Sequence, residues 1–170
     1  MFRRKFLVLT MAAALVLPAA PASASAARGG WEPWPTPPID IAAGVACDFA
    51  VHGDPIVDEV VRKVVATYPD GSTKRQLAKG TLILRMTNAG TGTGTVIDAS
   101  GRAAFDFAAD GTVTVLVIGP ILIPFRAGLS NVPRGLYAID GAYRIVLEPD
   151  SFRRLTLIHG TIHNVCDDLD

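Results

Sequence analysis

The sequence predicts an all-β domain: an antiparallel meander closed as a small up-and-down β-barrel, with a two-layer β-sandwich as the alternative. Three observations lead to this prediction. Short apolar runs alternate with polar residues at a period of two, and turn-forming residues separate these runs at short intervals. Beyond residue 26, no segment of helical length has a helical pattern. Both architectures bury one face of each strand, and a barrel also removes exposed strand edges.

The first 26 residues have the three parts of a secretory signal peptide. Residues 1–5 hold three basic side chains, residues 6–17 form an apolar run too short to span a bilayer, and small residues follow Pro18. Cleavage after Ala24 or after Ala26 fits the small residues there. We therefore expect a secreted, extracellular protein, and no later segment is apolar enough to cross a membrane as a helix.

The charge balance changes once the signal peptide is removed. The chain has 170 residues, 49% of them hydrophobic, with 16 basic and 16 acidic residues. Three of the basic residues and none of the acidic ones lie in 1–26, so the remaining chain has a formal charge of −3. A chain of this length can bury one sizeable core. The lack of basic excess argues against nucleic-acid binding through phosphate contacts.

Residues 27–43 form a leader rich in proline and tryptophan. Proline fixes φ and removes an amide donor, so this segment is expected to be extended and polyproline-like. Trp31 and Trp34 can either pack on the domain or recognise a partner. The leader is expected to lie as an arm on the surface of the domain.

The single β-domain is expected over residues 44–170, with eight to ten strands. Residues 57–68 are rich in β-branched side chains and end at Pro69-Asp-Gly-Ser72, which favours a hairpin turn. Residues 77–87 alternate, with Leu82, Leu84 and Met86 on one face. Further strands, each ending at glycine, proline, asparagine or aspartate, are expected at 93–99, 103–108, 112–118, 121–125, 136–140, 143–147 and 153–166.

Glycine and threonine alternate over residues 91–95. No helix is expected to follow, which argues against a phosphate-binding loop. Alternating glycines in a strand are typical of a bend. We therefore expect a barrel corner at this position.

Cys47 and Cys166 are the two cysteines of the chain, and they lie near the two ends of the domain. Exported proteins meet oxidising conditions, in which such a pair forms a disulfide. A catalytic thiol would need a nearby base or a C-x-x-C partner, and neither is visible. We predict a disulfide that joins the N-terminal and C-terminal strands; two free thiols are the alternative.

The sequence predicts no metal, no cofactor and no recognisable catalytic motif. His159 and His163 have the spacing of a zinc-protease helix, but Gly160 stands where the catalytic glutamate belongs. On a strand these two histidines lie about 13 Å apart, too far to ligate one ion. No serine lies in a G-x-S-x-G motif, although a catalytic triad is recognised in space rather than in sequence.

The apolar segment 118–125, with two prolines, is followed by a link over residues 126–134. A proline-interrupted apolar edge beside such a link can form the rim and lid of a cavity; an edge strand that packs its own core is the alternative. If the domain is hollow, the candidate lining residues are Leu82, Leu84, Phe105, Phe107, Tyr143 and Ile145. The same residues fit a solid core equally well.

Several of these features together resemble a known group of proteins. The leader, the entry strand Cys47-Asp-Phe49, the Pro-Asp-Gly turn and the exit strand Val165-Cys166 resemble small secreted actinobacterial all-β proteins of unknown function. The resemblance covers about residues 44–170. It implies export, the disulfide and the all-β fold, and it brings no catalytic residues.

We interpret the chain as a secreted, non-catalytic binding module for a small apolar ligand. A cell-surface structural module, or a protein-interaction or inhibitor module that uses the leader, is the first alternative. A cofactor-free enzyme of the allene oxide cyclase or dirigent-like barrel type is the second. Such barrels catalyse by shaping a cavity, and this alternative requires a buried charged, tyrosine or histidine side chain in that cavity.

Overall fold

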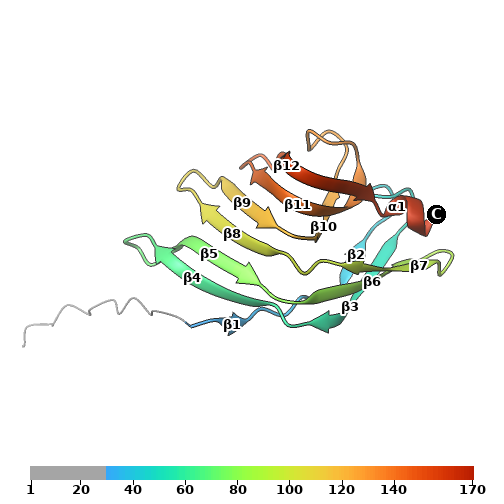
Figure 1. Ribbon diagram of the computed structural model, residues 1–170. Coiled ribbons are helices and arrows are strands. Elements are labelled where there is room, and N and C mark those ends of the chain that lie inside the picture. Colours follow the sequence, from blue (N-terminus) through green and yellow to red (C-terminus); the bar gives the residue numbers. More distant parts are fainter. Residues whose placement is uncertain (1–29) are drawn as a thin grey trace, which may run out of the picture.

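The computed structural model describes residues 30–170, and this part of the chain is all-β apart from one short C-terminal helix (Figure 1). The named strands pair antiparallel throughout, which confirms the predicted all-β antiparallel fold. The elements are β1 (Glu32–Pro33), β2 (Ile39–Ile41), β3 (Val51–Asp58), β4 (Val61–Thr67), β5 (Thr73–Lys79), β6 (Leu82–Asn88), β7 (Gly94–Asp98), β8 (Arg102–Phe107), β9 (Val113–Ile118), β10 (Ile121–Phe125), β11 (Gly135–Leu147), β12 (Arg153–Asn164) and α1 (Cys166–Leu169).

The predicted signal peptide, with its two candidate cleavage sites, lies outside the described residues. Within residues 30–170, no helix is both long enough and apolar enough to cross a bilayer. The described part of the leader lies on the β-domain as two short strands. Its strands β1 and β2 pair with β4 and β3 and so extend the two sheets of the β-domain.

Most strands come in consecutive pairs that form one long strand with a bend in the middle. Glu59 and Val60 alone separate β3 from β4, and Gly80 and Thr81 alone separate β5 from β6. β7 and β8, and then β9 and β10, follow each other in the same way. The first three of these long strands pair in chain order on both sides of the bend, whereas the fourth pairs with the third through β9 only. The chain is therefore a meander of long, bent strands (Figure 1).

The bend divides the meander into two sheets. The larger sheet has the order β1-β4-β5-β8-β9-β11-β10, with β12 also paired to β11, and the smaller has the order β2-β3-β6-β7. Within residues 30–170 the ladders do not continue from β7 to β10 or from β12 to β1. Pro124 lies within β10, and proline restricts a strand to a sheet edge. These pairings do not form a closed ring, so closure into a barrel stays a prediction.

A row of glycines lies along the bend. Its members are Gly80, Gly101, Gly119, Gly141 and Gly160. Gly141 and Gly160 face each other across β11 and β12, with φ values of 132° and 126°, where side chains are strained. A Cβ on Gly160 would overlap the carbonyl oxygen of Asp140. The absence of side chains thus lets neighbouring backbones cross closely at the bend.

The bend expected at residues 91–95 is wrong. Residues 89–93 form the turn between β6 and β7, and Gly94 begins β7. Asn88 shapes this turn, because its side-chain oxygen accepts hydrogen bonds from the backbone N–H of Gly90 at 2.9 Å and of Thr91 at 3.3 Å. The glycines there belong to a turn, whereas the bends lie at the opposite ends of β6 and β7.

Two apolar clusters hold the bent meander together. The first packs the smaller sheet against the beginning of β11 and the C-terminal residues, and its members include Leu84, Met86, Leu136 and Leu169. The second lies within the larger sheet and combines buried residues of β9, β10, β11 and β12. Such burial of apolar area is the main source of stability. Between the two clusters, on the inner side of the bend, the packing leaves a hollow.

The predicted disulfide between Cys47 and Cys166 is confirmed, with a Cα–Cα distance of 5.5 Å. The bridge lies just outside the strands: Cys47 is in the turn between β2 and β3, and Cys166 begins α1. The side-chain amide of Asn88 donates a hydrogen bond of 3.0 Å to the carbonyl oxygen of Leu169 and fixes the end of α1. The N-terminal and C-terminal parts of the domain are therefore joined covalently.

Candidate functional site

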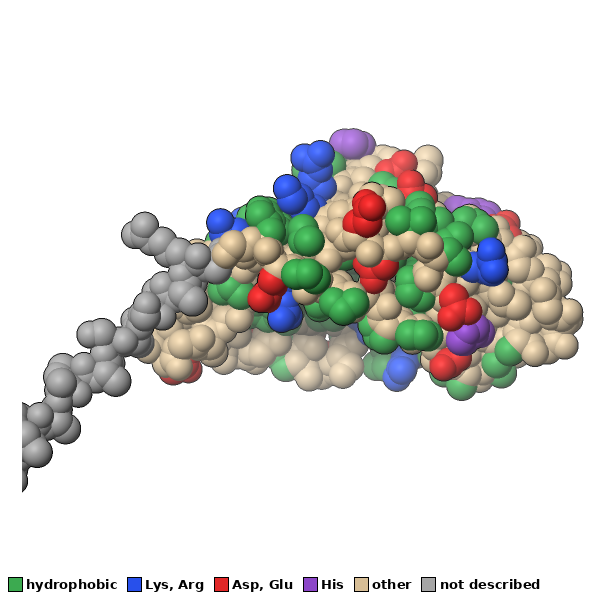
Figure 2. Space-filling view, turned by 90° about the horizontal axis from the view of Figure 1, so that it is seen from below, with side chains coloured by type: hydrophobic (Ala, Val, Ile, Leu, Met, Phe, Trp, Pro, Cys, Tyr) green, Lys and Arg blue, Asp and Glu red, His purple; other side chains and the backbone are tan. Residues whose placement is uncertain are grey.

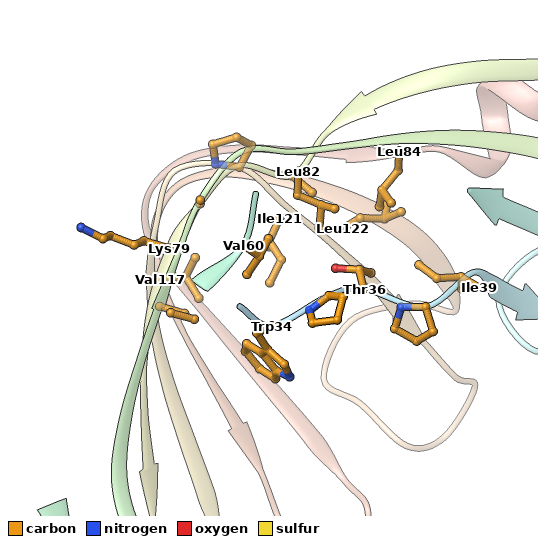
Figure 3. Close-up of a pocket in the computed structure, with 18 of the residues that line it drawn as sticks. Trp34, Thr36, Ile39, Val60, Lys79, Leu82, Leu84, Val117, Ile121 and Leu122 are labelled. Carbon is orange, nitrogen blue, oxygen red and sulfur yellow. The ribbon is translucent and has the colours of Figure 1, made fainter. Parts of the chain in front are cut away.

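The hollow on the inner side of the bend is an apolar pocket of about 350 Å³ (Figure 3). The long strands β5–β6 and β7–β8 form its floor, the leader forms one wall, and the β9–β10 strand forms the other. The described residues that line it are Trp34, Pro35, Thr36, Pro37, Ile39, Val60, Ala78, Lys79, Gly80, Leu82, Leu84, Ala99, Gly101, Ala103, Phe105, Val117, Pro120, Ile121 and Leu122.

Space remains above the floor of the pocket because small residues occupy most of the positions that point inward. Every second residue of two neighbouring strands lines the pocket, which is the period of side chains on one face of a sheet. Five of these eight positions carry alanine or glycine, and leucine or phenylalanine occupies the others. The two sets are Ala78, Gly80, Leu82 and Leu84 on β5–β6, and Ala99, Gly101, Ala103 and Phe105 on β7–β8.

Trp34 in the leader forms the wall at one end of the pocket. Its indole ring packs edge-on against Phe105, with ring centroids 5.9 Å apart and ring planes at 78°. The guanidinium of Arg62 lies 5.7 Å from the centroid of the Trp34 ring. The backbone N–H of Trp34 donates to the carbonyl oxygen of Val60 at 2.8 Å. Trp34 is therefore held on three sides by the domain, in an arrangement typical of aromatic and cation–π contacts.

The rest of the leader wall is fixed by a backbone hydrogen bond and by proline. The backbone N–H of Thr36 donates to the Asp58 carboxylate at 2.6 Å. Pro35 and Pro37 flank Thr36, and their fixed φ angles limit the conformations of this segment. These constraints hold the leader wall in place against the domain.

The opposite wall comes from the segment expected to form a cavity rim. Pro120, Ile121 and Leu122 line the pocket where β9 gives way to β10. The link over residues 126–134 does not line it. Instead, Asn131 in the link accepts a hydrogen bond from the backbone N–H of Leu155 at 2.7 Å and donates one to its carbonyl oxygen at 2.8 Å. The link thus covers part of the outer edge of β12 rather than acting as a lid.

Charged groups play little part in the described lining. Lys79 is its one charged residue, and Figure 3 shows its side chain pointing away from the pocket, whereas Leu82, Ile121 and Leu122 lie around the central space. The Lys79 ammonium lies 4.5 Å from the centroid of the Trp31 ring instead. Apolar walls with few polar groups are typical of sites for small apolar molecules.

The six candidate cavity residues lie in three places. Leu82, Leu84 and Phe105 line the pocket. Phe107 faces a second depression of about 460 Å³, beside the turns that follow β4 and β8. Tyr143 and Ile145 are fully buried in the second apolar cluster, where β10 and the beginning of β11 cover them. The leader residues and the small residues of the floor were not among the candidates.

Two of the three histidines, His52 and His163, pair with aspartates rather than forming a joint site. His52 lies between Asp40 at 2.7 Å and Asp54 at 3.0 Å, and His163 lies 2.8 Å from Asp168. In residues 30–170 no group of three histidine, cysteine, aspartate or glutamate side chains is arranged to hold a metal ion. In Figure 2, basic and acidic side chains are interspersed among apolar ones, and no charge of one sign dominates that face.

The fold and the pocket define the described chain as a disulfide-bonded all-β domain with an apolar pocket inside a bent meander. Comparison with protein-family models, with curated proteins and with solved structures found no match.

Proposed function

We propose that this protein is an exported, non-catalytic binding module that holds a small apolar molecule in the pocket at the bend. The observation that carries this proposal is the composition of the lining, in which aliphatic, aromatic, proline and glycine residues predominate and the charged group points outward (Figure 3). Removing apolar ligand surface from water supplies the driving force, at about 25 cal/mol per Å².

The pocket supports binding better than the alternatives derived from the sequence. A leader that recognises a protein partner would use its two tryptophans, but Trp34 is packed against Phe105 and Arg62, and Trp31 alone is exposed, with the Lys79 ammonium over its ring. A cavity enzyme of the allene oxide cyclase or dirigent-like type would need a buried charged, tyrosine or histidine side chain. Such a group is not among the described lining residues, and the buried Tyr143 lies in the neighbouring cluster.

Export is the second part of the proposal. The N-terminal sequence pattern supports it, and the disulfide between Cys47 and Cys166 is compatible with an oxidising compartment. Intact mass of the protein from the culture medium tests it. A mature chain beginning at Ser25 or Ala27 is expected, and a full-length chain retained in the cells would contradict export.

The proposed binding function does not require the sheet to close into a full barrel, because the leader already forms a wall of the pocket.

A pair of variants on one strand tests the binding function. Ala103→Leu places a larger side chain in the pocket, whereas Ala104→Leu makes the same change on the opposite face of β8. We expect the apolar fluorophore N-phenylnaphthylamine to bind the unmodified protein and Ala104→Leu equally, and to bind Ala103→Leu at least about tenfold more weakly. Equal binding to all three proteins, or to none, would refute the proposal.

A further inference from the structure

The leader wall carries a hydroxyl group that faces into the pocket. Thr36 supplies it, and no other described residue of the lining has a hydroxyl. The residue is half-buried, between the two prolines of the wall. Figure 3 shows its oxygen on the side that faces Val60 and Ile121, which lie across the central space. A molecule in the pocket therefore meets this hydroxyl.

The other polar side-chain groups of the described lining point elsewhere. The Lys79 ammonium lies 4.5 Å from the centroid of the Trp31 ring, and its side chain points away from the pocket. The indole nitrogen of Trp34 lies on the side of its ring that faces away from Val60 and Ile121 (Figure 3). Thr36 therefore supplies the polar side-chain group that a ligand can reach from the central space.

The Thr36 hydroxyl is available to a ligand. Within residues 30–170 it forms no hydrogen bond, and no polar side-chain atom there is both fully enclosed and unpaired, so its oxygen is accessible. A purely apolar ligand that covers this oxygen would remove its access to water without replacing the hydrogen bond, which costs free energy. A ligand with a hydrogen-bonding group at this point avoids that cost.

The backbone around Thr36 has no free donor. Three of residues 34–38 are proline, which has no N–H. The backbone N–H of Trp34 donates to the carbonyl oxygen of Val60 at 2.8 Å. That of Thr36 donates to the Asp58 carboxylate at 2.6 Å. This part of the wall therefore presents oxygen atoms to a ligand, and a hydroxyl is an uncharged group that can donate to them.

The charge beside Thr36 disfavours a charged ligand. The two carboxylate oxygens of Asp58 accept the backbone N–H groups of Thr36 and, at 3.1 Å, of Val60. This negative charge repels an anionic group placed at the Thr36 hydroxyl. Asp58 is not among the described lining residues, so a cationic group in the pocket would not contact it directly. Burying either charge without a partner is costly.

We propose that the ligand of this pocket is a neutral apolar molecule that carries a hydroxyl group, and that Thr36 accepts a hydrogen bond from that hydroxyl. This inference rests on the proposed binding function and names the chemical class of its ligand. It assigns the hydroxyl to the leader wall and the apolar part to the floor and the opposite wall, where Leu82 and Leu122 lie.

Competition against bound N-phenylnaphthylamine tests the class of ligand. The competitors are naphthalene, 2-naphthol, 2-naphthoate and 2-naphthylmethylammonium. All four contain the naphthalene ring of the probe, so the polar group changes while the ring stays the same. At neutral pH we expect 2-naphthol to compete at least about tenfold better than either charged compound, because the lining has no partner for a buried charge.

Three variants locate the hydrogen bond, with the affinity of the probe measured for each protein. Thr36→Val keeps the size of the side chain and removes the hydroxyl, so 2-naphthol should bind about five- to tenfold more weakly while naphthalene binds unchanged. Thr36→Ser keeps the hydroxyl and should retain most of the affinity for 2-naphthol. Thr156→Val makes the same substitution at an exposed position of β12 and should change neither affinity.

The outcomes separate this inference from the function on which it rests. If Thr36→Val weakens naphthalene and 2-naphthol equally, or weakens neither, the assignment of Thr36 is wrong, although the binding function stands. If either charged compound competes as well as 2-naphthol with the unmodified protein, the neutral class of ligand is wrong, whether or not the variants fold. If N-phenylnaphthylamine does not bind the unmodified protein, the proposed function fails first and the inference falls with it.

Discussion

The indole ring of Trp34 packs edge-on against the phenyl ring of Phe105, although Trp34 belongs to the N-terminal leader and Phe105 to β8. This contact makes the leader one wall of the pocket floored by β5–β6 and β7–β8. It therefore links an N-terminal segment with no regular apolar pattern to the proposed binding function.

Trp34→Ala should weaken binding of N-phenylnaphthylamine at least about tenfold, because it removes the wall at the end of the pocket. Trp34 is half-buried, so the substitution should cost about 2 kcal/mol of unfolding free energy, less than for a fully buried aromatic residue. Trp31→Ala is the matched control, since Trp31 is 42% exposed and does not line the pocket. Equal losses of binding in the two variants would argue against the leader as a wall.

Gly160→Ala should lower the free energy of unfolding by about 3 kcal/mol or more, measured by chemical denaturation. The new Cβ would overlap the carbonyl oxygen of Asp140, and φ at this residue is 126°. Two controls separate these causes. Gly128→Ala has an unfavourable φ of 72° in open space and should cost about 1 kcal/mol, and Gly30→Ala has neither problem and should be neutral. Similar stability in all three variants would mean that close backbone contact does not shape the bend.

Reduction of the Cys47–Cys166 bridge should lower the free energy of unfolding by about 2–5 kcal/mol, because the bridge closes most of the domain as one loop. Denaturation curves with and without reductant measure this difference. The double variant Cys47→Ala/Cys166→Ala should match the reduced protein and should not respond to reductant. A protein that is equally stable in both states would show that the bridge contributes nothing to the fold.

The pKa of His52 should lie above its ordinary value of 6.5. The hydrogen bond to Asp40 is the largest cause, followed by the charge of Asp54. A neutral imidazole has one N–H, so only the protonated ring can donate to both carboxylates. A raised folded-state pKa adds stability below the unfolded value, and this stability is lost as the pH rises through the folded value.

A proton NMR titration of the His52 ring checks this value. Asp40→Asn should bring the pKa closer to 6.5 and flatten the decline in stability above that pH. If Asp40→Asn leaves the titration of His52 unchanged, the contact between His52 and Asp40 does not persist in solution.

Local patterns in the sequence were sufficient to predict the antiparallel strands and the disulfide. Alternation of apolar and polar residues indicates a half-buried strand, as at Leu82, Leu84 and Met86. Two cysteines at the ends of one domain leave a single pairing to consider. These features depend on neighbouring residues or on residue type, and not on the register between strands.

The bend and the complete pocket could not be predicted, because both depend on register. The glycines at 101 and 141 are far apart in the sequence and join the same row, on either side of Gly119, only after the strands pair. Tyr143 alternates like a lining residue, but β10 and the beginning of β11 cover it. Ala103 and Ala78 are small residues on ordinary strands, and their importance lies in the space that they leave.

The central claim is that an apolar molecule binds inside the bend, and amide chemical-shift mapping with ¹⁵N-labelled protein tests it most directly. On titration with N-phenylnaphthylamine, the account predicts the largest shifts at Leu82, Ala103 and Leu122, which come from three strands around the pocket. Exposed apolar residues of β12, such as Ile158 at 67% exposure, should not respond. Largest shifts on β12, or no shifts at saturating probe, would contradict the account.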